Sequence, residues 1–207
     1  MEYDMEFLKY LISLLVIVDP IFAAIVVGGL IKDQKLLEKV AFRSSLTVLI
    51  AFLVTIFAGE RLLKTMGVNI FSVKIFGGLI LLQMAFQMLQ ANPPKAKHTA
   101  EEEEAAMEKD DISIIPIGIP ILFGPGTFTT VLIFKEEALG VWNEIMLILA
   151  GILTAFIIYL VLKNTGFFAK KLGTTGINVV VRILGLLVGA LGSQFVVDGV
   201  KHLWIQG

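Results

Sequence analysis

The sequence predicts an all-α membrane protein with six transmembrane helices, arranged as two inverted three-helix repeats, with broken helices in spans one and four. Three observations predict this class. The 207 residues are 57% hydrophobic and only 17% charged, whereas a soluble domain carries about a quarter charged residues. Six apolar stretches have the length that crosses a bilayer. Helix-breaking residues recur near the middle of the first stretch of each half.

The apolar stretches place the spans in order along the chain. Each is long enough to cross about 30 Å of hydrocarbon at about 1.5 Å per residue. Lys74 and Arg182 lie near the ends of their spans, where a long basic side chain can snorkel to the interface. We expect spans at residues 7–31, 40–58, 70–91, 112–134, 143–162 and 178–199.

A polar stretch, ANPPKAKHTAEEEEAAMEKDD, separates the third span from the fourth. Pro93 and Pro94 end the preceding helix, and the acidic run is too polar to be buried. We therefore expect a first three-helix repeat at residues 1–91, a polar cytoplasmic linker at 92–111 and a second three-helix repeat at 112–207.

The two halves resemble each other in sequence. VNIFSVKIFGG in the third span is similar to INVVVRILGL in the sixth, and Asp19-Pro20-Ile21 stands opposite Gly124-Pro125-Gly126. Because each half has an odd number of spans, the second half must be inverted relative to the first. Inverted repeats with broken helices are the architecture of many secondary transporters.

The distribution of basic residues predicts the orientation. The loops after the first, third and fifth spans carry more lysine and arginine than the termini and the other two loops. The positive-inside rule places those three loops in the cytoplasm and both termini outside a cell membrane. The acidic start, MEYDMEFLKY, is not that of a cleavable signal peptide.

Composition also excludes several functions. A net charge of −1 leaves no basic face for nucleic acid. The chain has no cysteine, which excludes thiolate catalysis and cysteine metal sites. The serines have no histidine partner within a span, and there is no P-loop. We expect neither an enzyme nor a bound cofactor, and any transport must use ion gradients.

The stretch IPIGIPILFGPGTFTTVLIF is apolar enough to span a membrane, but it contains five helix breakers. An unwound segment at membrane depth is tolerated where it lines a cavity, and its free N–H groups can bind a substrate. The alternative is a kinked, tightly packed helix whose threonines bond to their own backbone. Candidate substrate-binding residues here are Gly124, Pro125, Gly126, Thr127 and Thr130.

Asp19 is the only acidic residue near the centre of an expected span. A carboxylate there costs several kcal/mol unless it is paired, protonated or hydrated. With Pro20 and Ile21 it is a candidate for binding a substrate ammonium group or the coupling ion, a proton or sodium. The alternative is a structural cap that accepts hydrogen bonds from backbone N–H groups.

Amide side chains in the third and sixth spans form a further candidate group. They can line a cavity or join helices as hydrogen-bonding partners. Gly185-x-x-x-Gly189 has the spacing of close helix packing and is compatible with a homo-oligomer. The amide candidates are Gln83, Gln87 and Gln194.

These motifs together resemble the MarC family of inner-membrane proteins, including its small neutral amino acid transporter (SnatA-like) branch. Pro116, Pro120 and Gly124-Pro125-Gly126 fit the family's proline and glycine pattern in the second half. Asp19-Pro20-Ile21 matches the first motif, but Phe22 replaces its usual glycine and Ile25 its second proline.

The resemblance implies a secondary transporter of small neutral amino acids such as glycine and alanine, driven by a proton or sodium gradient. Alternating access would then operate around a site at the breaks of spans one and four. The alternatives are a non-transporting membrane scaffold that recruits partners through the acidic loop, an intramembrane enzyme and a channel.

Overall fold

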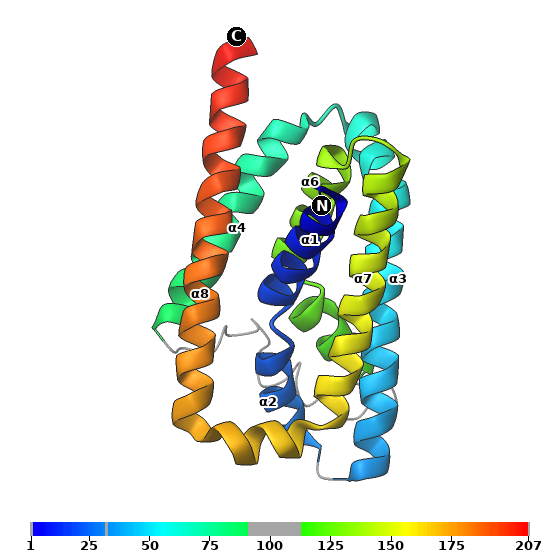
Figure 1. The fold of residues 1–207 in the computed structure, drawn as a ribbon, viewed down its shortest axis with the longest axis vertical. Coiled ribbons are helices and arrows are strands. Elements are labelled where there is room, and N and C mark those ends of the chain that lie inside the picture. Colours follow the sequence, from blue (N-terminus) through cyan, green and yellow to red (C-terminus); the bar gives the residue numbers. More distant parts are fainter. Residues whose placement is uncertain (1, 32, 91–112, 207) are drawn as a thin grey trace.

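The computed structural model describes residues 2–31, 33–90 and 113–206, and every element within these ranges is helical. The predicted linker, residues 92–111, lies outside them. The all-α class is confirmed. In chain order the elements are α1 (Glu2–Val18), α2 (Pro20–Leu30), α3 (Gln34–Met66), α4 (Ile70–Leu89), the π-helical η1 (Ser113–Leu122), α6 (Pro125–Glu137), α7 (Val141–Lys163) and α8 (Thr165–Gln206) (Figure 1).

Five helical stretches among the described residues are long and apolar enough to cross a membrane, where the sequence predicts six. The first expected span, residues 7–31, is divided at Asp19 into α1 and α2. The fourth, residues 112–134, is divided between η1 and α6, neither of which has the length of a span. The five stretches are Met5–Leu30, Gln34–Met66, Ile70–Leu89, Val141–Lys163 and Thr175–Ile205.

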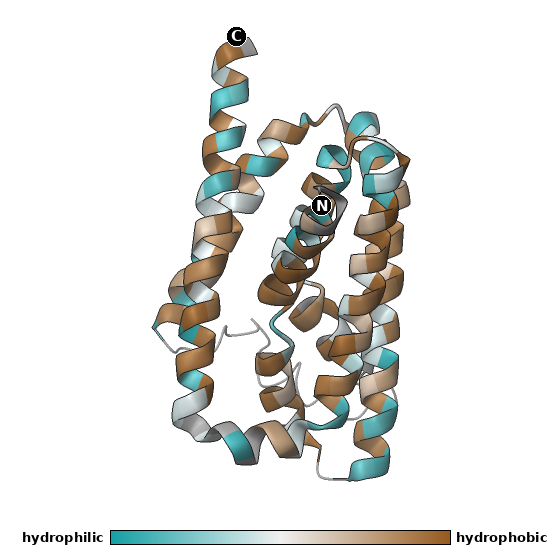
Figure 2. Cartoon of the chain, in the orientation of Figure 1, coloured by the Kyte–Doolittle hydropathy of each residue, from teal (hydrophilic) through white to brown (hydrophobic). Residues whose placement is uncertain are grey.

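Apolar side chains cover the outside of the bundle as well as its interior. Phe57, Phe76 and Phe86 are 71%, 67% and 62% exposed. Hydrophobic residues fill the middle of the helices, and hydrophilic residues gather toward the two ends of the bundle (Figure 2). Such a surface is costly in water but stable in hydrocarbon. The fold is therefore that of a multi-pass integral membrane protein.

The helix ends alternate between the two ends of the bundle. The start of α1, the α3–α4 turn, the α6–α7 turn and the C-terminal end of α8 lie at one end, which we call the N-terminal end (Figure 1). The α2–α3 and α7–α8 connections lie at the other. Gly67 closes α3 with a φ of 68°, and its amide donates to the carbonyls of Leu63 and Lys64.

Helix α8 changes direction at Gly173, where φ is 59° and ψ is 177°. A residue with a side chain rarely adopts this conformation. The segment before the kink crosses the end of the bundle, and the segment after it runs antiparallel to α4 (Figure 1). Gly173 thus allows α8 to run across the end of the bundle before it and along the bundle after it.

The α4–α8 pair is the most extensive helix contact in the described chain. A Cβ added at Gly78 would lie 2.5 Å from the Gly192 carbonyl oxygen, and one added at Gly199 would lie 2.7 Å from the Phe71 carbonyl oxygen. Glycines therefore bring the two backbones together, as is common between membrane helices. We call the α4–α8 contact through these glycines the glycine seam.

Four shorter helices surround this seam, and we call them the half-length helices because each forms part of one expected span: α1, α2, η1 and α6. α1 packs on α7, and η1 packs on α3. α2 contacts α7 and α8, and α6 contacts α3 and α4. The long helices α3 and α7 pack against each other, and the half-length helices meet as α1 with α6 and α2 with η1. The half-length helices therefore occupy the centre of the bundle.

Replacing Gly78 with alanine is expected to destabilise the fold by about 1–3 kcal/mol, because an inserted methyl group would overpack the glycine seam. The measurement is thermal unfolding in detergent micelles. Gly29→Ala is the matched control, since a Cβ there meets no heavy atom within 4 Å. Equal melting temperatures for the two variants would contradict the close approach of α4 and α8.

Candidate functional site

The junction between α1 and α2 is built around Asp19 and Pro20. Proline has no N–H to donate, and its fixed φ suits the first position of a helix, so α2 begins at Pro20. Asp19 is the N-cap residue, with φ 45° and ψ 67°. It is the one non-glycine residue with positive φ among those the structure describes. Such strained positions occur often at functional sites.

The Asp19 side chain is buried and acts as a cap. Its carboxylate accepts a hydrogen bond from the Phe22 amide at 3.1 Å, and the residue is 8% exposed. The Asp19 amide donates to the Leu15 carbonyl at 3.1 Å, and its own carbonyl accepts from the Ala23 amide at 3.2 Å. The partial positive charge of the α2 N-terminus also faces this carboxylate. Asp19 therefore acts as the N-terminal cap of α2.

Ile21, the third candidate here, follows Pro20 in the first turn of α2 and is half-buried, while Pro20 itself is buried. All three candidates thus belong to one helix start.

The junction between η1 and α6 lacks such a cap. η1 ends at Leu122, and the Phe123 amide donates to the Gly118 carbonyl at 3.0 Å. Gly124 occupies the N-cap position of α6 and makes no side-chain hydrogen bond there, and Pro125 opens the helix. The N-terminus of α6 therefore carries a partial positive charge that no side chain of its own neutralises.

The threonines of α6 bond to backbone carbonyls near them. Thr129 Oγ1 donates to the Pro125 carbonyl and Thr130 Oγ1 to the Gly126 carbonyl, both at 2.8 Å. Thr127 Oγ1 reaches across the junction to the Leu122 carbonyl at 3.3 Å. Gly126 and these threonines are buried, whereas Pro125 is exposed and Gly124 half-buried. Only the Thr127 hydroxyl thus satisfies a carbonyl at the break, while Thr129 and Thr130 bond back to carbonyls one turn earlier in their own helix.

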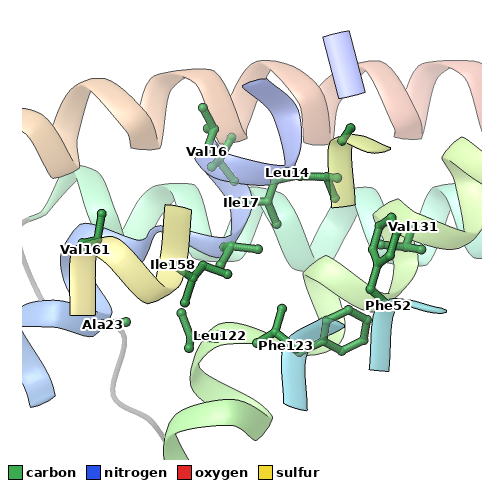
Figure 3. Close-up of a cluster of buried hydrophobic side chains, with 14 of the residues drawn as sticks. Leu14, Val16, Ile17, Ala23, Phe52, Leu122, Phe123, Val131, Ile158 and Val161 are labelled. Atoms are coloured by element: carbon green, nitrogen blue, oxygen red, sulfur yellow. The ribbon is translucent and has the colours of Figure 1, made fainter. Parts of the chain in front are cut away.

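The two junctions approach each other inside the bundle. Figure 1 shows both near the middle of its length. Buried side chains from both sides meet in one cluster, with Ile17 from the end of α1, Leu122 from the end of η1 and Ile158 from α7 (Figure 3). Four helix ends, two N-terminal and two C-terminal, therefore face one region of the core.

The amide candidates lie elsewhere. Gln83 is exposed on the face of α4 that also carries the exposed Phe76 and Phe86. Gln87, one turn further on, is half-buried. Gln194 is exposed on α8 and donates to both carboxylate oxygens of Asp198, at 3.0 and 3.1 Å. Gln83 and Gln194 thus face the outside of the bundle rather than the junctions.

A groove of about 740 Å³ reaches the second junction from the side of the bundle. Its walls are apolar apart from two threonines of α3, whose hydroxyls donate to Arg43 and Ala51 carbonyls of their own helix. Such walls suit acyl chains better than a zwitterion. The groove is lined by Thr47, Ile50, Ala51, Val54, Thr55, Ile119, Phe123, Gly124, Pro125 and Phe128.

Sequence reasoning missed an ion pair between α4 and α6. It expected Lys74 to snorkel to the interface, but Lys74 is 7% exposed and its Nζ lies 2.7 Å from Glu137 Oε1. The expected spans start the third crossing near residue 70 and end the fourth near residue 134, on the same side of the membrane. That proximity was the available signal, because an acidic residue just beyond one span could then reach a basic residue inside the other.

The comparisons with known proteins place the chain among integral membrane proteins. The family model described as MarC family integral membrane protein matches residues 5–204. A UPF0056 membrane protein of Aquifex aeolicus is 35% identical over 98% of this chain and 95% of its own length. UPF0056 membrane protein MJ1677 of Methanocaldococcus jannaschii is 31% identical over 88% of this chain and 87% of its own.

A more distant relative, UPF0056 membrane protein YhcE of Escherichia coli, is 26% identical over 96% of this chain and 93% of its own length. No solved structure is significantly similar to this chain. The family match covers almost all of the residues that form the bundle and both junctions. The chain belongs to the MarC family of integral membrane proteins.

Proposed function

We propose that this chain is a secondary transporter of small neutral amino acids such as glycine and alanine, which works by alternating access and is coupled to a proton or sodium gradient. One observation carries the proposal: two helices are interrupted within the apolar bundle, and their interruptions face one region of its core. Broken helices at membrane depth are typical of transporter substrate sites. The substrate class comes from the resemblance to the SnatA-like branch of the family.

The electrostatics of the junctions suit a zwitterion. The uncapped N-terminus of α6 at Gly124 offers main-chain N–H donors and a partial positive charge to the substrate carboxylate. Asp19 and the carbonyl ends of α1 and η1 offer negative charge to the ammonium group. Asp19 is also the proposed site of the coupling proton or sodium ion.

Close packing around α6 supports a small substrate. A Cβ added at Gly126 would lie 2.8 Å from Met84 Sδ and 3.0 Å from Leu81 Cδ2. α4 therefore presses against the Gly126 face of α6 and leaves little free volume there, whereas the apolar groove opens on the face of Pro125 and Phe128. A substrate that binds between Gly126 and α4 would have room only for a short side chain or none.

The packing pattern supports two inverted repeats, at residues 1–91 and 112–207. Exchanging α1 with η1, α2 with α6, α3 with α7 and α4 with α8 maps the principal contacts onto one another. The α1–α7 contact becomes η1–α3, and the α2–α8 contact becomes α6–α4. α4 and α8 run antiparallel (Figure 1), as inversion requires. Such a pseudo-twofold relation would let the two halves exchange conformations during alternating access.

We further propose that the α2–α3 and α7–α8 connections face the cytoplasm and that both termini lie outside the cell. The basic residues near those connections, including Lys35, Lys39 and Lys171, support this orientation.

Uptake of labelled glycine and alanine into proteoliposomes tests the proposal. With an imposed inward proton or sodium gradient, the wild-type chain is expected to accumulate both substrates. Asp19→Asn is expected to reduce uptake about tenfold to a hundredfold, because losing a charge-assisted hydrogen bond costs about 1.5–3 kcal/mol. Gly124→Leu is also expected to reduce uptake, because its side chain would fill the space at the start of α6.

Gly29→Leu is the control for this assay, since a Cβ added at Gly29 meets no heavy atom within 4 Å and Gly29 lies near the far end of α2 from its junction. It should transport as well as the wild type. No uptake of any small neutral amino acid by folded, reconstituted protein under either gradient would refute the proposed substrate class. Full uptake by Asp19→Asn would leave Asp19 as a helix cap alone.

A stability comparison separates these two roles of Asp19. Asn is expected to cost less than about 0.5 kcal/mol, because its side-chain oxygen can cap Phe22 and because it tolerates a left-handed backbone. Ala is expected to cost about 2–3 kcal/mol, since it loses the cap and strains the backbone. The measurement is the melting temperature in micelles. If Asn and Ala destabilise equally, the Asp19 charge is itself part of the folded structure.

A further inference from the structure

One carboxylate joins three helices at the N-terminal end of the bundle. Glu137, the last residue of α6, accepts from Lys74 of α4 at 2.7 Å through Oε1. Its Oε2 lies 3.5 Å from Lys9 Nζ of α1. Lys9 also lies 3.7 Å from Glu6 Oε2 in the preceding turn. The Lys74 side chain is 9% exposed and the Glu137 side chain 29%, so this pair is partly shielded from water.

An aromatic layer lies directly beneath these charges. The rings of Tyr10 and Phe134 are 5.2 Å apart and each residue is 1% exposed, and Phe195 of α8 lies 6.2 Å from Phe134. Lys9 Nζ lies over both the Tyr10 and Phe134 rings, at 5.6 and 5.8 Å. The charged and aromatic layers together separate the solvent at this end from Asp19, which follows the last residue of α1 about two and a half helical turns beyond Tyr10.

α6 connects this closure to the proposed site. Its first residue follows Gly124, and its last residue is Glu137. A straight helix of 13 residues is about 20 Å long and moves as a unit. Displacement of its N-terminus on substrate binding would therefore shift Glu137 relative to Lys74 and Lys9.

We propose that Glu137 is a positioning residue, a latch that ties α6 to α1 and α4 through Lys9 and Lys74 and holds the N-terminal end of the bundle closed. The inference rests on the proposed function, because it assigns this contact to one of the two gates that alternating access requires. Breaking the latch frees α6 and admits water toward the junctions from this end.

A second ion pair of α6 offers a matched contrast. Lys135 Nζ lies 2.6 Å from Glu144 Oε1 of α7, at the same end of the bundle. The Lys135 and Glu144 side chains are 20% and 42% exposed, against 9% and 29% for Lys74 and Glu137, so water competes more strongly with the Lys135–Glu144 pair. Buried pairs are far more sensitive to the loss of one partner, because the other charge is left without compensation. Disrupting the Lys74–Glu137 pair should therefore have a larger effect on this end of the bundle than disrupting the Lys135–Glu144 pair.

The absence of cysteine allows a clean accessibility test. Ser13→Cys places a reporter one turn deeper than Tyr10, at a position that is 7% exposed. Thr65→Cys, at an exposed position near the α3–α4 turn, identifies the preparation in which the N-terminal end faces the reagent. A membrane-impermeant maleimide is added to whole cells and to inverted membrane vesicles, and the rate of labelling is measured.

In the preparation that labels Thr65→Cys, the Ser13→Cys chain is expected to react slowly. Adding Glu137→Gln or Lys74→Met should raise the rate about tenfold or more, by shifting the population toward the open state. Lys74→Arg, which keeps the charge pair, should restore slow labelling. Glu144→Gln should leave the rate unchanged.

Unchanged labelling in folded Glu137→Gln and Lys74→Met chains would overturn the latch. So would an equal increase in Glu144→Gln, which would indicate general loosening of this end. If Glu137→Gln does not fold, the comparison of Lys74→Met with Lys74→Arg decides. Labelling does not require transport, so a latch that opens as expected in a chain without amino acid uptake would reject the proposed substrate and keep the latch.

Discussion

The fold depends on one constraint, the cost of leaving main-chain polar groups without partners in hydrocarbon. Each interrupted helix frees such groups, and the chain satisfies them locally. Asp19 accepts from the Phe22 amide at the first junction, and Thr127 donates to the Leu122 carbonyl at the second. Asp19 and Pro20 are buried, which keeps the first junction away from lipid. The second junction is shielded less completely, because the apolar groove reaches Gly124 and Pro125.

The same constraint explains how polar residues are used elsewhere in the bundle. The buried hydroxyls of Thr55 and Thr154 return to carbonyls one turn earlier in their own helices, at 2.7 and 2.8 Å. Contacts between helices are made instead by glycines and apolar side chains. Ion pairs between helices, such as Lys163 of α7 with Glu38 of α3, lie toward the ends of the spans. The interior thus has few charges, and Asp19 is conspicuous among them.

The sequence predicted the helical class, and helix breakers act within a few residues of their position. Asp19-Pro20 and Gly124-Pro125 each mark a helix start where the pattern expected an interruption. The sequence pattern does not fix the rotation of each span about its axis, because packing decides it. Gln83 and Gln194 were therefore expected as cavity candidates, but they face outward. The partner of Lys74 was missed for a related reason. Glu137 lies outside the apolar stretch, and their pairing depends on how α4 and α6 cross.

The glycine seam has a consequence for how the two halves can diverge. α4 belongs to the first half of the chain and α8 to the second. At Gly78 and Gly192 the two backbones are so close that neither position has room for a side chain. A larger side chain on one helix would have to be matched by a smaller one on the other. If the two halves descend from one duplicated ancestor, substitutions along the glycine seam in either half have been limited by the residues of the other half.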